Sequence, residues 1–130
     1  MQHVHAVVWI DHDEAHVIHF NPDESEELTV HSKPRRGHLH HKSGQLGDGH
    51  AAEDHDYYGL VETALAGAQE ILIVGPASAK DELQKHMKHH AKLLAACIVG
   101  VERVDHPSDA QILTLARKYF KAADKLRQST

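Results

Sequence analysis

A short apolar run at residues 71–74 constrains the fold of this chain more than any other feature. It reads Ile-Leu-Ile-Val and stands between Glu70 and the pair Gly75-Pro76. A run of this length without polar alternation fits a central strand that is buried on both faces, and the Gly-Pro pair ends it. A strand of this kind requires a sheet covered by other elements on each side, which indicates an α/β fold.

Four further strands are predicted, at residues 4–10, 15–20, 28–30 and 98–104. Short polar connections join the first three, so we expect an antiparallel meander. Apolar residues at helical spacing predict helices over residues 51–68, from Ser78 and from Ser108. Ser78 with Asp81, and Ser108 with Gln111, resemble capping boxes at the starts of the last two helices.

Two of these helices have apolar stripes that predict which side packs on the sheet. In the first, the stripe comprises Tyr57, Leu60, Val61, Ala64, Leu65 and Ala68. In the last, it comprises Ile112, Leu115, Ala116, Tyr119, Ala123 and Leu126. Residues three and four apart share one side of a helix, so each stripe is expected to face the core.

The order of these elements predicts the topology of the sheet. After the meander, each later strand is reached through a helix, and such crossovers are right-handed and place strands in parallel. The expected fold is therefore ribonuclease H-like: a mixed five-stranded sheet, with an antiparallel meander plus two parallel strands, flanked by helices. A chain of 130 residues suits a single domain spanning residues 1–130.

The amino-acid composition indicates where the protein is located and which kinds of disulfide and metal site it can form. The first residues lack a basic segment followed by an apolar one, and no apolar run approaches the roughly 20 residues of a membrane span, so we expect a cytoplasmic protein without a membrane partner. The single Cys97 excludes an intramolecular disulfide and a cysteine-type zinc site. The net charge of −5 counts the 15 histidines as neutral, so overall charge does not identify a partner.

Positive charge is concentrated at about residues 33–50. The segment has no acidic residue before Asp48, although the chain holds 19 acidic against 14 basic residues. Several glycines and Pro34 disfavour a persistent helix or strand, so we expect a mobile basic loop. A loop of this kind on an acidic domain indicates insertion into RNA. The predicted RNA-binding residues are Lys33, Arg35, Arg36, His38, His40, His41 and Lys42.

A metal-dependent nuclease is a competing interpretation of the same fold. Such an enzyme needs carboxylates from the end of the first strand, the first helix and the end of the fourth strand. Asp11 and Asp13 follow the first strand, but the fourth ends in Gly75-Pro76 without an acid. The alternative for residues 11–13 is a solvated hairpin turn, which makes the nuclease the less favoured function.

Histidine pairs offer a second possible metal chemistry. His86 and His90 lie four apart on one helix, and His3 and His5 share one face of a strand. Neither pair has a clear third ligand in the sequence, and the crowded loop histidines are explained by pH-dependent charge. We therefore predict no metal site and no cofactor.

Several motifs resemble the middle domain of the archaeal and eukaryotic class-1 peptide-release factors and their Pelota-like and bacterial relatives. In that family a strand meander leads to a basic Gly-Gly-Gln loop and a long helix. A strand then turns through Gly-Pro or a similar pair into a helix beginning Ala-Lys. The matching segments here are residues 33–37, Ser43-Gly44-Gln45, the helix from Ala51 and residues 71–80. The resemblance covers nearly the whole chain.

This resemblance implies entry of the loop into the peptidyl transferase centre of the ribosome, with tRNA and ribosomal RNA rather than DNA as partners. The catalytic residues would be Gly44 and Gln45, whose backbone helps water attack the peptidyl-tRNA ester. Ser43 stands where the family has its first glycine. A middle domain alone does not read stop codons, so the resemblance implies codon-independent ribosome rescue or, as in relatives with altered triplets, cleavage of a tRNA end. The alternative is a non-catalytic RNA- or ribosome-binding module, for example one occupying idle ribosomes, that uses the loop and the basic face of the last helix.

That basic face comprises Arg117, Lys118, Lys121, Lys125 and Arg127. Charge on the outer side of an amphipathic helix is expected without any ligand, and a solvated face is the favoured interpretation.

Overall fold

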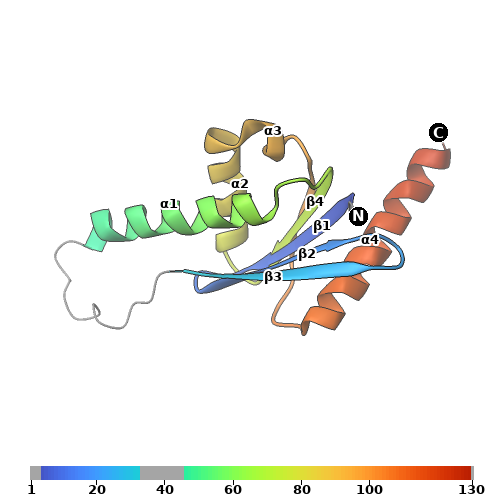
Figure 1. Cartoon of the computed structure of the whole chain (residues 1–130), viewed down its shortest axis with the longest axis horizontal. Coiled ribbons are helices and arrows are strands. Elements are labelled where there is room, and N and C mark those ends of the chain that lie inside the picture. Colours follow the sequence, from blue (N-terminus) through green and yellow to red (C-terminus); the bar gives the residue numbers. More distant parts are fainter. Residues whose placement is uncertain (1–3, 33–45, 130) are drawn as a thin grey trace.

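The computed structural model describes residues 4–32 and 46–129, and of residues 46–53 and 127–129 it describes the backbone alone. The chain begins with three strands, β1 (His5–Ile10), β2 (Glu14–Phe20) and β3 (Ser25–His31). It continues through α1 (Leu46–Ala64), β4 (Glu70–Gly75), α2 (Ala79–His90), the short α3 (Lys92–Ala95), β5 (Ile98–Arg103) and α4 (Asp109–Ser129) (Figure 1).

The strands form one mixed sheet in the order β3-β2-β1-β4-β5. β1 pairs antiparallel with β2, and β2 with β3, as expected for a meander. β4 pairs parallel with β1 and with β5, because α1 and α2 return the chain to the starting edge before each new strand. The ribonuclease H-like arrangement of an antiparallel meander plus two parallel strands is confirmed.

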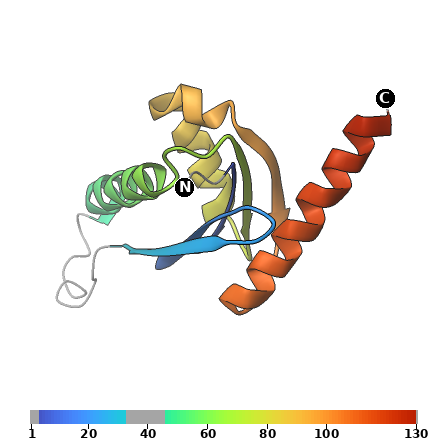
Figure 2. The same cartoon turned by 45° about the vertical axis from the view of Figure 1, so that its right-hand side comes forward.

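The sheet separates two apolar cores. The first lies against α1 and α2 and contains the β1 residues Ala6, Val8 and Ile10 together with Ile71 and Ile73 of β4. The second lies against α4 and contains the intervening residues of the same strands, Val7, Trp9, Leu72 and Val74. Figure 2 shows the two layers, with α1 and α2 on one side of the sheet and α4 on the other.

Residues 71–74 are fully buried, as the apolar run predicted for a central strand. β1 is equally enclosed, with Ala6, Val7, Val8 and Ile10 all inaccessible to solvent. β3 differs, because only Val30 is half-buried along its length. The buried centre of the molecule is therefore the β1–β4 pair, and β3 is an exposed edge.

The first helix begins earlier than expected. α1 starts at Leu46, so residues 46–50, which were predicted to belong to the loop, are helical. Gly47 and Gly49 each cost a helix about 1 kcal/mol relative to alanine, which weakens a helix without preventing it. Gly67, with φ of 93°, lies in the turn after the helix, where glycine adopts a positive φ without steric cost.

The apolar stripes were wrong in part. Leu60 of α1 is 56% exposed, and Leu115 and Leu126 of α4 also face solvent, whereas Phe120 is buried. A helix rotates by about 100° per residue, which places Leu60 and Leu115 outside the arcs that the buried residues define. Leu126 lies in the last turns of α4, which extend beyond the sheet (Figure 2).

The two predicted caps had different outcomes. At α4 the Ser108 amide donates to Gln111 Oε1 at 2.8 Å and the Gln111 amide to Ser108 Oγ at 3.2 Å, which confirms the capping box. At α2 the Ser78 side chain makes no cap hydrogen bond, and its hydroxyl donates to Glu82 instead. Ser78 already has helical dihedral angles, so its side chain points away from the free amides.

No helix in the part of the chain that the structure describes combines the length and the apolarity needed to cross a bilayer.

The central strand pair makes a specific prediction about two glycines. A methyl group on Gly75 would clash with the carbonyl oxygen of Ile10 in β1, whereas one on Gly59 of α1 would meet open space. We expect Gly75→Ala to lower the free energy of unfolding by about 1–3 kcal/mol, because neither backbone can move without disturbing the buried ladder. The control Gly59→Ala should raise it by about 0.5–1 kcal/mol. Urea denaturation measures both, and equal effects would contradict the close approach.

Candidate functional site

The residues predicted to act on RNA lie outside the described part of the chain. They are Gly44 and Gln45 together with Lys33, Arg35, Arg36, His38, His40, His41 and Lys42. The structure describes the two ends between which they run, Ser32 after β3 and Leu46 at the start of α1. Both ends lie on the same side of the molecule (Figure 1). The Ser32 amide donates to the Asp13 carbonyl at 2.9 Å, which fastens the first end to the β1–β2 turn.

The acids after β1 form a hairpin turn. Asp11 Oδ1 accepts hydrogen bonds from the amides of Asp13 at 2.8 Å and Glu14 at 2.9 Å. Tyr57 of α1 donates its hydroxyl to the Asp11 carbonyl at 2.9 Å. The Asp11 carboxylate thus closes a hairpin turn. This is the structural role that the sequence offered for residues 11–13 as the alternative to metal binding.

Two adjacent tyrosines fix α1 over this face of the sheet. Burial, with the nearby Asp11 as a further cause, raises the pKa of the Tyr57 hydroxyl far above its ordinary value. Burial also raises the pKa of Tyr58, and its hydrogen bond to Glu82 Oε1 at 2.7 Å adds to the rise. Both hydroxyls therefore stay protonated and act as donors at physiological pH.

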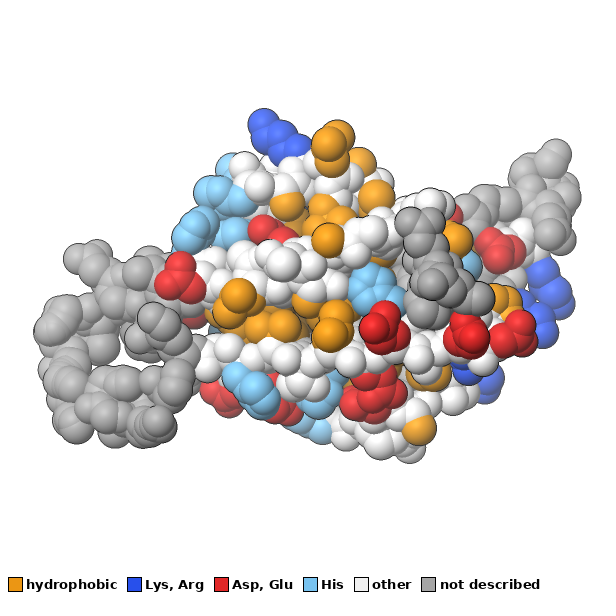
Figure 3. Space-filling view, in the orientation of Figure 1, with side chains coloured by type: hydrophobic (Ala, Val, Ile, Leu, Met, Phe, Trp, Pro, Cys, Tyr) orange, Lys and Arg blue, Asp and Glu red, His pale blue; other side chains and the backbone are white. Residues whose placement is uncertain are grey.

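Three histidines meet where α1 packs on α2. His86 and His90 lie one turn apart on α2, and His55 comes from α1. One ligand atom from each of them lies within 4.8 Å of the others. We call these residues the three-histidine cluster. Figure 3 shows histidine side chains gathered on the surface where the two helices cross.

The cluster is held by hydrogen bonds at its inner end. His86 Nδ1 lies 2.5 Å from Glu62 Oε2, and the side chains of both residues are only 11% exposed. His86 Nε2 lies 2.8 Å from His55 Nδ1. In the neutral form of His86 whose Nδ1 donates to the carboxylate, Nε2 carries the lone pair and accepts the proton of His55 Nδ1.

His90 completes the cluster at its exposed end. Its ring centroid lies 4.4 Å from that of His86 and 5.0 Å from that of His55. Partial removal from water, and the neighbouring His86 and His55, lower the pKa of His90. The neutral imidazole, which is the form that binds a metal, is therefore favoured.

Sequence reasoning identified the His86–His90 pair but not its partners. His55 lies 31 residues before His86, and only the packing of α1 on α2 brings them together. The available signal is the spacing of His55 and Glu62, seven residues apart and thus on one side of α1. Among the side chains that the structure describes, no other set of three histidine, cysteine or acidic residues converges in this way. The carboxylate cluster of a two-metal nuclease is thus absent from the described residues.

The basic residues of α4 do not act as one surface. Arg117 Nη2 donates to the carbonyl of Asn21 at 3.0 Å and to that of Glu24 at 3.3 Å, which ties the β2–β3 turn to α4. Lys118 and Lys121 are exposed to solvent, as a solvated face predicts. Arg117 therefore has a structural role.

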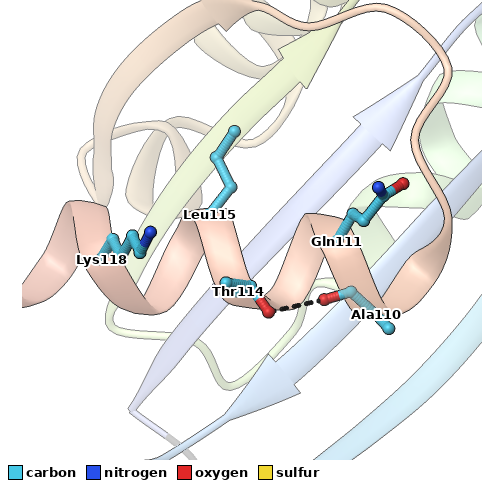
Figure 4. A pocket seen from close by; sticks show the side chains of 5 residues that line it. All are labelled: Ala110, Gln111, Thr114, Leu115 and Lys118. Atoms are coloured by element: carbon cyan, nitrogen blue, oxygen red, sulfur yellow. Dashed lines mark hydrogen bonds between the residues drawn. The ribbon is translucent and has the colours of Figure 1, made fainter.

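A shallow hollow lies on the outer side of α4. Its lining residues, Ala110, Gln111, Thr114, Leu115 and Lys118, all come from this one helix (Figure 4). The Thr114 hydroxyl donates to the Ala110 carbonyl at 3.0 Å, and Gln111 belongs to the capping box. Because the hollow is shallow and the polar groups of Thr114 and Gln111 are engaged within the helix, it does not resemble a substrate site.

Comparison with solved structures identifies proteins of similar fold. Pelota from Archaeoglobus fulgidus matches with a TM-score of 0.64 and 13% identity, over 99% of this chain and 36% of that one. Dom34 from S. cerevisiae, described as a translation termination-like factor, gives 0.58 and 12%, over 95% and 34%. The archaeal translation termination factor aRF1 gives 0.57 and 12%, over 95% and 39%.

The chain thus spans little more than a third of each of these structures, and at these identities the likeness shows a shared fold. No protein-family model and no curated protein matches the sequence.

The different roles of the α4 bases are testable by stability measurements. Arg117→Ala should lower the free energy of unfolding by about 1–3 kcal/mol, because it removes charged donors from two backbone carbonyls and the packing of the side-chain stem. The matched control Lys121→Ala, on the exposed side, should change it by less than about 0.5 kcal/mol. Chemical denaturation gives the free energy of unfolding of both variants. Similar values would contradict the stabilising link between Arg117 and the β2–β3 turn.

Proposed function

We propose that this chain is a ribosome-associated translation factor that resembles a release-factor middle domain and hydrolyses peptidyl-tRNA in codon-independent ribosome rescue. The fold that it shares with Pelota, Dom34 and aRF1 carries the proposal. Two of those proteins, aRF1 and Dom34, are named as translation termination or termination-like factors, and we assign a related role to this chain as part of this proposal. We propose that the chain acts in the cytoplasm, at the peptidyl transferase centre of the ribosome.

The order of elements around the Gly44-Gln45 pair supports this function. β3 closes a meander, a basic segment follows, and α1 starts at Leu46, directly after Gln45. β4 then ends at Gly75, Pro76 follows, and α2 begins with Ala79-Lys80. These are the features, in the same order, on which the resemblance to release-factor middle domains rests.

The proposed chemistry needs little more than backbone. Glycine lacks a Cβ, so Gly44 allows the chain to approach a crowded RNA wall. The Gln45 amide then donates to the oxyanion that develops as water attacks the ester carbonyl, and the 3′-hydroxyl of the tRNA leaves. Lys33, Arg35, Arg36 and Lys42, with His38, His40 and His41 when protonated, would neutralise phosphates around this point.

A second candidate function is a non-catalytic ribosome-binding module. Ser43 favours it, because serine takes up the backbone conformations open to glycine at a cost. The exposed Lys118 and Lys121 of α4 would supply a second basic contact. The two functions differ in which residues matter, since catalysis depends on Gly44 and Gln45, and binding on Arg35 and Arg36.

Peptide release separates these functions directly. Purified ribosomes carrying labelled peptidyl-tRNA and an empty A site are incubated with the wild-type chain, Gly44→Ala or Gln45→Ala. We expect release by the wild type and a fall of roughly 10²–10³-fold in Gly44→Ala, the cost of misplacing one oxyanion donor. Gln45→Ala keeps the backbone donor, so it should lower release less than Gly44→Ala does, while ribosome binding remains.

Gln69→Ala is the matched control, because Gln69 is an exposed glutamine in the connection before β4. It should release peptide at the wild-type rate. Binding without release from the wild-type chain would favour the binding module, and neither binding nor release would contradict both functions.

Salt dependence tests the phosphate contacts separately. With about four contacts, the logarithm of the ribosome-binding constant should fall against the logarithm of salt concentration with a slope of about −3. Replacing Arg35 and Arg36 by alanine should reduce the magnitude of that slope by about 1.4, since each contact contributes about 0.7. Sedimentation with ribosomes over a salt series gives both slopes. An unchanged slope in the double variant would exclude the two arginines from the interface.

A further inference from the structure

The three-histidine cluster has a donor arrangement that suits a metal ion. Its ligand atoms lie within 4.8 Å of one another on two packed helices. Two nitrogen ligands at about 2.0–2.1 Å from a tetrahedral zinc ion lie roughly 3.4 Å apart, so small side-chain rotations bring the three donors into range. His55 and His90 are exposed, which leaves them free to make those rotations.

Glu62 occupies the position of an outer-shell partner. A metal-binding histidine commonly donates its second ring nitrogen to a carboxylate, which sets the tautomer and the ring orientation. His86 Nδ1 makes that contact with Glu62 Oε2, at 2.5 Å. In that tautomer the lone pair of His86 Nε2 is directed at His55, whose Nδ1 lies 2.8 Å away.

The donor set selects the class of metal. Three neutral imidazoles suit Zn²⁺, Cu²⁺ or Ni²⁺, whereas Mg²⁺ and Ca²⁺ prefer oxygen ligands. Three protein ligands also leave one tetrahedral position for water or for a donor from another molecule. The exposure of two of the three ligands makes that position accessible.

We propose that His55, His86 and His90 bind one zinc-class divalent cation, with Glu62 as the positioning carboxylate behind His86. The bound ion joins α1 to α2. Each histidine binds the ion as a neutral imidazole, through the ring nitrogen that carries no proton. This site goes beyond the proposed translation function and differs from the expectation, drawn from the sequence, that the chain holds no metal.

Zinc titration of single histidine variants tests the site. The full-length chain is freed of metal with a chelator and titrated with Zn²⁺ by calorimetry, as the wild type, His55→Asn and His90→Asn. We expect the affinity to fall at least tenfold in each variant. The same addition of Zn²⁺ should raise the Tm of the wild type, and Mg²⁺ should leave it unchanged.

His89→Asn is the matched control, since His89 lies beside His90 on α2 but outside the cluster. Its zinc affinity should stay within about twofold of the wild type. Unchanged affinity in His55→Asn and His90→Asn, as binding by the loop histidines alone would give, overturns the proposal. An equal loss in His89→Asn overturns it as well.

Glu62→Gln provides a test that leaves all three ligands in place. Loss of an outer-shell carboxylate lowers metal affinity about 10–100-fold, and circular dichroism confirms that the variant is folded. Full zinc affinity in a folded Glu62→Gln protein would contradict the role of His86 as a ligand held by Glu62.

Discussion

The enclosure of β1 and β4 on both faces is the constraint on which the rest of the structure depends. The two strands lie side by side in parallel and share the centre of the sheet, with β2 and β5 beyond them. Their backbone groups have no access to water and are satisfied through the ladders on either side. Their side chains need apolar partners above and below the sheet, which is why helices cover both faces. The connections through α1 and α2 follow, because parallel strands require the chain to return across the sheet.

Much of this architecture was predictable because it rests on local patterns. The apolar run of β4 and its Gly-Pro end are sequence features, and the parallel pairing follows from the helices between strands. The side of each helix that faces the core was less predictable. Leu60 and Leu115 have the spacing of core residues but lie outside the buried arcs of their helices, and Leu126 lies beyond the end of the sheet. Periodicity reveals the apolar side of a helix, whereas the width and the length of its contact depend on the neighbouring element.

The candidate sites differ in how much of each could be predicted from the sequence. His86 and His90 share a helix turn, so their pairing is a local matter, but His55 and Glu62 reach them only through the packing of α1 on α2. Arg117 has the appearance of a surface cation in sequence, yet it binds backbone carbonyls nearly 100 residues away along the chain. Gly44 and Gln45 remain predictions that follow from motif and order. A long-range contact between polar side chains is hard to recognise in a single sequence, because neither of its residues belongs to a local sequence pattern.

The anchoring of α1 has a mechanical consequence. The Tyr57 hydroxyl donates to the Asp11 carbonyl, and near the end of α1 the Ala64 carbonyl lies 2.7 Å from His19 Nε2. The first turns of α1 extend past the end of the strands (Figure 1). At a rise of 1.5 Å per residue, Leu46 lies about 16 Å along the axis from Tyr57. The helix thus has an anchored segment from Tyr57 to Ala64 and an arm that precedes it. A tilt of the anchored segment by about 10° would displace the first turn by roughly 3 Å over such an arm, so the packing of α1 on α2 sets the position at which residues 33–45 join the helix.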